Sequence, residues 1–179
     1  MGVSPRAHVA FVILGVALLA AGRPARAATL SLSDSVLAPY ALGEKFDPPA
    51  TTSSAFQMTD TYRLDEGHGN QPLLRYEDET EDATYFIETT ARDGLIYSLG
   101  WTRVLSETEA DALSADWLGR LAARFGLPDD AAVDGTTHAV AWTEEKAGTR
   151  LELILQPEDQ DSTDWEVSAV VRRQVRGAK

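Results

Sequence analysis

The sequence predicts an α+β fold, in which an antiparallel sheet of about five to seven strands has one long helix packed across it, after a cleaved N-terminal signal peptide. Three observations lead to this prediction: an uncharged stretch near the N-terminus, a strongly capped amphipathic segment at 107–125, and β-rich runs on both sides of that segment. Several of the loops that join these runs are too short for the crossovers of parallel strands, so antiparallel pairing is expected.

The first 27 residues are typical of a secretory signal peptide. Arg6 gives a positive start, the 14 residues from Val9 to Gly22 carry no charge, and the small residues Ala25 and Ala27 fit signal-peptidase recognition. Fourteen helical residues span about 21 Å, less than a hydrocarbon core of about 30 Å. No twin-arginine pair precedes the apolar stretch, so we expect bacterial general secretion to the periplasm or the medium. Signal cleavage leaves no stable membrane anchor.

The chain after the signal peptide divides into two parts. Residues 28–57 are an extended lead-in segment rich in Ser, Thr and Pro, with Pro48-Pro49 favouring extended chain. Four apolar residues are expected to tether it to the rest: Leu37, Tyr40, Leu42 and Phe46. Residues 58–179 are expected to form the α+β globular domain.

Seven β-rich runs are expected as strands. Asp93-Gly94 between two of them is a strong hairpin signal. In the last three runs, alternate residues are apolar, which indicates one buried face. The predicted strands are 59–64, 72–76, 84–91, 95–105, 137–143, 149–155 and 165–171.

The best-defined element is a helix that follows Ser106. Ser106 and Glu109 have the spacing of a capping box, and Gly126 with Pro128 ends the helix. An apolar stripe is expected to cover the sheet: Ala110, Leu113, Ser114, Trp117, Leu118, Leu121 and Phe125. Opposite that stripe lies a group of small residues, which is either a solvent-exposed face or a face that contacts the lead-in segment or a partner protein: Ala112, Ala115, Gly119, Ala122 and Ala123.

Composition excludes several classes of function. The chain has no cysteine, so disulfides, thiol nucleophiles and Cys-ligated metals are ruled out. The formal net charge of −12 disfavours nucleic acid as a partner. Phosphate-binding glycine motifs are missing from the sequence. The basic end at 172–179 is either a solvated tail or a docking arm for an acidic partner.

Candidate catalytic and metal-binding residues are few. There is no Gly-x-Ser-x-Gly motif, and His68 and His138 lack the spacing of metal ligands. The sequence therefore predicts no catalytic residue, no metal ligand and no cofactor. Whether acidic loops such as that of Asp159, Asp161 and Asp164 bind calcium is left open.

The function expected from these observations is that of an exported, non-catalytic domain, periplasmic or secreted. It would recognise a protein partner or another component of the cell envelope. Two alternatives remain. One is a binding protein for a small ligand or a divalent cation, with Trp101, Trp142 and Trp165 either in the core or lining a groove. The other is a hydrolase whose site the sequence does not reveal.

Overall fold

The computed structural model describes residues 30–32, 35–47, 56–63, 72–159 and 162–174. Eight strands and one helix lie within these ranges. In chain order they are β1 (Gln57–Arg63), β2 (Pro72–Glu79), β3 (Thr84–Thr90), β4 (Ile96–Ser106), α2 (Glu107–Phe125), β5 (Asp130–Asp134), β6 (Thr137–Glu144), β7 (Thr149–Pro157) and β8 (Asp164–Arg173).

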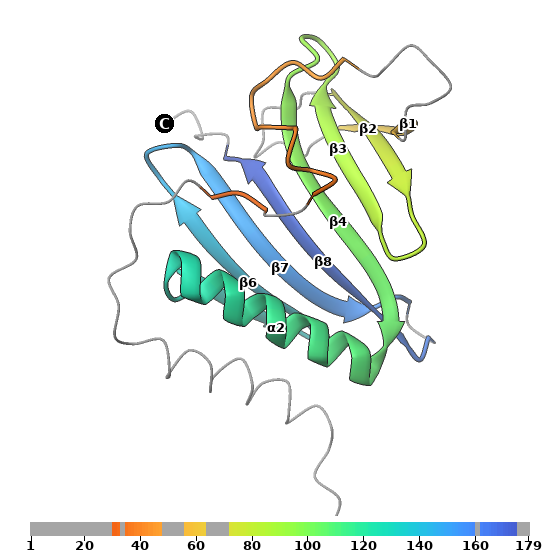
Figure 1. Ribbon diagram of the computed structural model, residues 1–179, viewed down its shortest axis with the longest axis vertical. Coiled ribbons are helices and arrows are strands. Elements are labelled where there is room, and N and C mark those ends of the chain that lie inside the picture. Colours follow the sequence, from red (N-terminus) through yellow and green to blue (C-terminus); the bar gives the residue numbers. More distant parts are fainter. Residues whose placement is uncertain (1–29, 33–34, 48–55, 64–71, 160–161, 175–179) are drawn as a thin grey trace, which may run out of the picture. The chain divides into compact units, whose positions relative to one another are not determined.

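The predicted α+β class with five to seven strands is wrong. Of the described residues, 53% lie in strands and 15% in one helix, so this part of the chain is mostly one antiparallel sheet of eight strands with a single helix. The strand order is β1-β2-β3-β4-β8-β7-β6-β5, and most of it can be followed in Figure 1. The signal peptide that formed part of the prediction lies outside the described residues.

The strand that the prediction missed is β5. Its sequence, DAAVD, contains one β-branched residue, and all five positions are exposed. A strand that buries neither face shows neither the alternation of apolar residues nor the apolar run by which strands are found in a sequence. The segment therefore resembled a polar connection.

The chain forms two compact units that interleave along the sequence. One unit includes Val104–Trp142 and Glu152–Val167, and so contains α2, β5 and parts of β6, β7 and β8. The other includes Leu30–Arg103, Thr143–Leu151 and the C-terminal part from Ser168. It contains β1 to β3, most of β4 and the remaining parts of β6, β7 and β8.

The helix has the predicted ends. Ser106 is its N-cap, and both the backbone N–H and the hydroxyl of Ser106 donate to Glu109 Oε2, at 3.2 and 2.5 Å. Gly126 follows the last turn with φ of 90°, a conformation that glycine adopts without strain. The predicted stripe is buried at Ala110, Leu118 and Leu121, and its other members are half-buried. Trp142 Nε1 donates to the Gly126 carbonyl at 2.9 Å, which joins the end of α2 to β6.

The lead-in segment extends the sheet beside the start of β4. Phe46 N–H donates to the Gly94 carbonyl at 2.9 Å, Gly43 N–H to the Ile96 carbonyl at 2.8 Å, and Ile96 N–H to the Glu44 carbonyl at 2.8 Å. The predicted tether is confirmed at Leu37 and Phe46, which are buried. The Phe46 ring lies 4.9 Å from that of Tyr76 on β2, so the segment packs on one face of the strands.

The first four strands have two different faces. Register pairs Tyr76 with Ile87 and Ile87 with Leu99, so these residues lie on the face that carries Phe46. This face is apolar and holds the core of the unit. The opposite face carries polar and charged side chains beside the buried residues Leu73 and Phe86, and these side chains form a network of ion pairs and hydrogen bonds.

Candidate functional site

A row of polar side chains crosses three neighbouring strands. Arg75 on β2 pairs with Glu88 on β3, and Glu88 pairs with Ser98 on β4. Residues directly opposite each other in antiparallel strands have their side chains on the same face, about 4.5–5.5 Å apart at Cβ. The register therefore brings an arginine, a carboxylate and a hydroxyl into contact, although 23 positions separate the outer two in the sequence.

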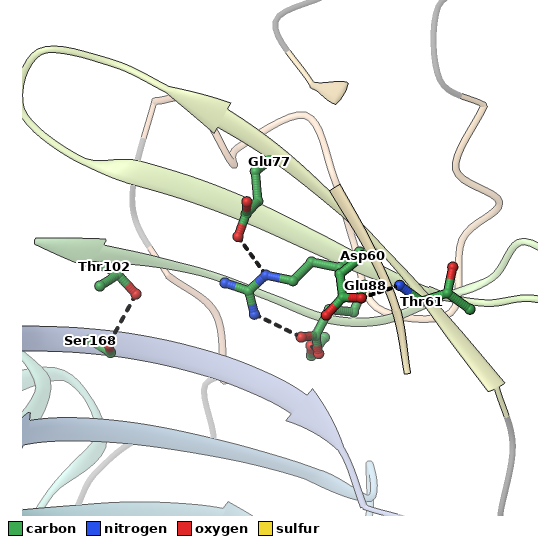
Figure 2. A network of polar contacts seen from close by, with 8 residues as sticks. Asp60, Thr61, Glu77, Glu88, Thr102 and Ser168 are labelled. Atoms are coloured by element: carbon green, nitrogen blue, oxygen red, sulfur yellow. Dashed lines mark hydrogen bonds and ion pairs between the residues drawn. The ribbon is translucent and has the colours of Figure 1, made fainter. Parts of the chain in front are cut away.

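Arg75 holds the row together. Its Nε lies 2.6 Å from Glu77 Oε1 and its Nη1 lies 3.0 Å from Glu88 Oε1. The guanidinium also stacks on the ring of Phe86, 4.1 Å from the ring centre. Figure 2 shows both ion pairs on one face of the strands. We call Arg75, Glu77, Glu88 and Ser98 the Arg75 network.

The inner end of the Arg75 network is buried. Ser98 Oγ donates to Glu88 Oε2, so the two oxygens of this carboxylate have different partners. Glu88 is 8% exposed and Ser98 is 1% exposed. A substrate could not reach the Ser98 hydroxyl without displacing the strands. The network satisfies buried polar groups and stabilises the sheet, as such networks do when their members are paired.

A second polar contact joins β4 to β8. The hydroxyls of Thr102 and Ser168 lie 3.0 Å apart, close enough for either one to donate. Between this contact and the Arg75 network stands Gly100. A Cβ atom on Gly100 would lie 2.5 Å from the Ala169 carbonyl oxygen and 2.7 Å from the Phe86 ring. The strands approach each other so closely here that no side chain fits.

The open edge of β5 is the second feature that could take part in binding. β5 is the last strand of the sheet and pairs along one side with β6, from Asp130↔Ala141 to Asp134↔Thr137, without a register shift. Val133 is 66% exposed, the highest value among the large apolar residues described. An edge strand leaves backbone N–H and C=O groups available for pairing with another chain.

The residues of the predicted partner-contact face on the helix differ in their exposure to solvent. Ala122 is buried, at 6% exposure, and so belongs with the core stripe. Ala112 and Ala123 are exposed, while Ala115 and Gly119 are half-buried. Apart from its chain neighbours and the nearby backbone of α2, no described atom lies within 4 Å of a Cβ placed on Gly119. Contact between this face and a partner stays a prediction.

The remaining candidates do not come together in the described residues. His68, Asp161, Ala25, Ala27 and the end of the basic tail, 175–179, lie outside them. Among the described residues, no three His, Asp or Glu side chains gather closely enough to hold a metal ion.

The other histidine and the tryptophans have described positions. His138 lies on β6 opposite Val133, and its Nδ1 is buried without a hydrogen-bond partner among the described atoms. Trp101 and Trp142 are 2% exposed and belong to the core. Trp165 is half-buried.

Sequence reasoning missed the Arg75 network. The alternation of β2 places Arg75 and Glu77 on one face, and this signal was present in the sequence. The partners on β3 and β4 depend on strand register, which the spacing of residues does not reveal.

Comparisons with models of known protein families, with curated proteins and with solved structures find no match. No helix among the described residues combines the length and apolar character that crossing a bilayer requires.

Proposed function

We propose that this protein is an exported, non-catalytic domain that recognises a protein or another component of the cell envelope. The signal-like leader of the sequence supports export to the periplasm or the medium. The observation that carries the recognition role is β5, a regular strand at the edge of the sheet with all five residues exposed.

The burial and pairing of the Arg75 network favour a binding function over hydrolysis. Ser98, the serine of the Arg75 network, is 1% exposed, and its hydroxyl donates to a glutamate that also pairs with Arg75. A nucleophile must be accessible and have a base that is available to take its proton. The Arg75 network meets neither requirement.

The test is capture of a partner, followed by reconstitution. A C-terminally tagged full chain is expressed in its native bacterium, cross-linked in the cell, and recovered from the envelope fraction. We expect a partner in near-stoichiometric amount that binds again when both components are purified separately. If the protein is recovered alone from both the envelope and the medium, or if no recovered candidate rebinds, the proposal is wrong.

A further inference from the structure

Alternate residues of β5 direct their backbone N–H and C=O groups to the open edge. A two-residue loop, Gly135-Thr136, joins β5 to β6, and Gly135 has φ of 60°, as the turns of such hairpins require. The pair that closes a two-residue hairpin is hydrogen-bonded, and hydrogen-bonded pairs then alternate along the strands. Asp134 and Ala132 therefore direct their backbone groups to β6. Ala131 and Val133 direct their N–H and C=O groups to the open edge.

The side chains of β5 give this edge a chemical pattern. Asp130, Ala132 and Asp134 share one face, so two carboxylates flank a small residue. On β6 the partners of Asp130 and Ala132 are Ala141 and Ala139, which leaves room beside Ala132 for a large side chain. On the other face lie Ala131 and Val133.

The opposite edge of the sheet differs. The pairing of β1 with β2 shifts register between Met58 and Asp60. Such irregularities bend an edge strand and discourage the addition of another strand. β5 has no such shift, so it is the more regular of the two edges.

Pairing with a second copy of the chain along the whole of β5 is unfavourable. Antiparallel pairing of β5 with its own copy, centred on Ala132, would place Asp130 of each chain opposite Asp134 of the other. Like charges directly opposite each other destabilise a strand pair. The occupant that fits has positive charges at those two positions.

We propose that β5 binds an extended segment of a partner protein as an added antiparallel strand. The segment carries Lys or Arg opposite Asp130 and Asp134 and three apolar residues between them. Main-chain hydrogen bonds to Ala131 and Val133 supply affinity, and the two aspartates supply selectivity. This inference rests on the proposed recognition function and names its site and its class of partner.

The first test uses synthetic peptides and the full chain. A peptide with the core Arg-Val-Leu-Val-Arg is compared with Glu-Val-Leu-Val-Glu by fluorescence anisotropy. We expect the basic peptide to bind at least about tenfold more tightly, a difference that added salt reduces. Equal affinities, or no binding of the basic peptide at millimolar concentration, would overturn the proposal.

Peptide methylation tests the hydrogen bonds themselves. The N–H groups of the two valines face Ala131 and Val133 in the proposed pairing, while the leucine N–H faces away. We expect N-methylation of either valine to weaken binding about tenfold, and N-methylation of the leucine to have little effect. Equal effects at all three positions would contradict strand addition.

Two variants test the protein side of the same contact. Val133→Pro removes an outward N–H, whereas Val133→Thr keeps that N–H and a branched side chain of similar size. We expect Val133→Pro to weaken peptide binding at least about tenfold and Val133→Thr to preserve it. Circular dichroism checks that both variants fold. If Val133→Pro does not fold, the methylated peptides decide the question.

The same variants separate this inference from the proposed function. If a captured partner is lost by Val133→Pro and kept by Val133→Thr, both stand. A partner retained equally by both variants leaves the recognition role in place and refutes the edge as its site. A β5-dependent dimer in sedimentation velocity experiments would refute the assignment of the occupant. If no partner binds any form, the proposed function fails, and the peptide affinities still decide whether the edge accepts a strand.

Discussion

At the scale of single residues, Glu88 is a buried carboxylate with two different partners. It accepts a hydrogen bond from Ser98 and pairs with Arg75 at 3.0 Å, while being 8% exposed. Removing one partner of a buried pair leaves the others without compensation, which costs more than the pair itself contributes.

We predict that Glu88→Ala lowers the free energy of unfolding by about 3 kcal/mol. Glu77→Ala is the matched control, because Glu77 also pairs with Arg75 but its side chain is 21% exposed. Its expected cost is about 1 kcal/mol, since solvent partly screens this half-buried pair. Urea unfolding of both variants measures the difference. Equal costs would mean that burial of Glu88 contributes nothing.

A pair of glycines gives a second prediction at this scale. Gly100→Ala places a methyl group 2.5 Å from the Ala169 carbonyl oxygen, so we expect a loss of about 2–3 kcal/mol in the free energy of unfolding. Gly119→Ala lies on α2 in open space and should gain up to about 1 kcal/mol from helix propensity. Thermal unfolding shows the sign of each change. A neutral Gly100→Ala would contradict the close approach of β4 and β8.

At the scale of elements, the start of α2 carries a dependence on pH. Hydrogen bonds from the side chain and then the backbone of Ser106 lower the pKa of Glu109 below its ordinary value of 4.5. Because the folded pKa is the lower one, the stabilisation is present above the unfolded pKa and is lost as pH falls through the folded pKa.

We therefore predict that Glu109→Ala destabilises the protein most at neutral pH. The difference in free energy of unfolding between the natural protein and the variant should shrink as pH is lowered from about 5 to about 3. Urea unfolding at several pH values measures this difference. If it is constant across the range, the carboxylate of Glu109 does not act through its charge.

The elements differ in how well the sequence predicts them. The bounds of α2 follow from Ser106, Glu109 and Gly126, because capping is local chemistry. The seven predicted strands correspond to observed strands: six of them bury residues, and β1, although exposed at Gln57–Thr61, is rich in Thr and Tyr. β5 was missed because it buries neither face and contains one β-branched residue. The Arg75 network could not be found because it depends on the register between β2, β3 and β4, and register is a property of the assembled sheet.

At the scale of the whole molecule, export is the property that can be tested most directly. We predict that protein recovered from the periplasm or the medium begins at Ala28, because Ala25 and Ala27 fit signal-peptidase recognition. Ala27→Arg should block cleavage and leave unprocessed precursor, while Ser31→Ala, beyond the site, should not. N-terminal sequencing and intact mass measure both. Recovery of exported protein that still begins with Met1 would contradict the prediction.

The contact of Thr102 with Ser168 has a consequence for the order of folding. It joins strands 66 positions apart in the chain, so β4 leaves the ribosome long before the strand that will lie beside it. The first four strands can pair through local hairpins, and residues 43–46 hydrogen-bond to the beginning of β4. The rest of the outer edge of β4 stays unpaired until the C-terminal strand, β8, is made. Pairing of strands so far apart in the chain is slow. Until β8 pairs with β4, the nascent chain exposes an unpaired strand edge that is prone to aggregation.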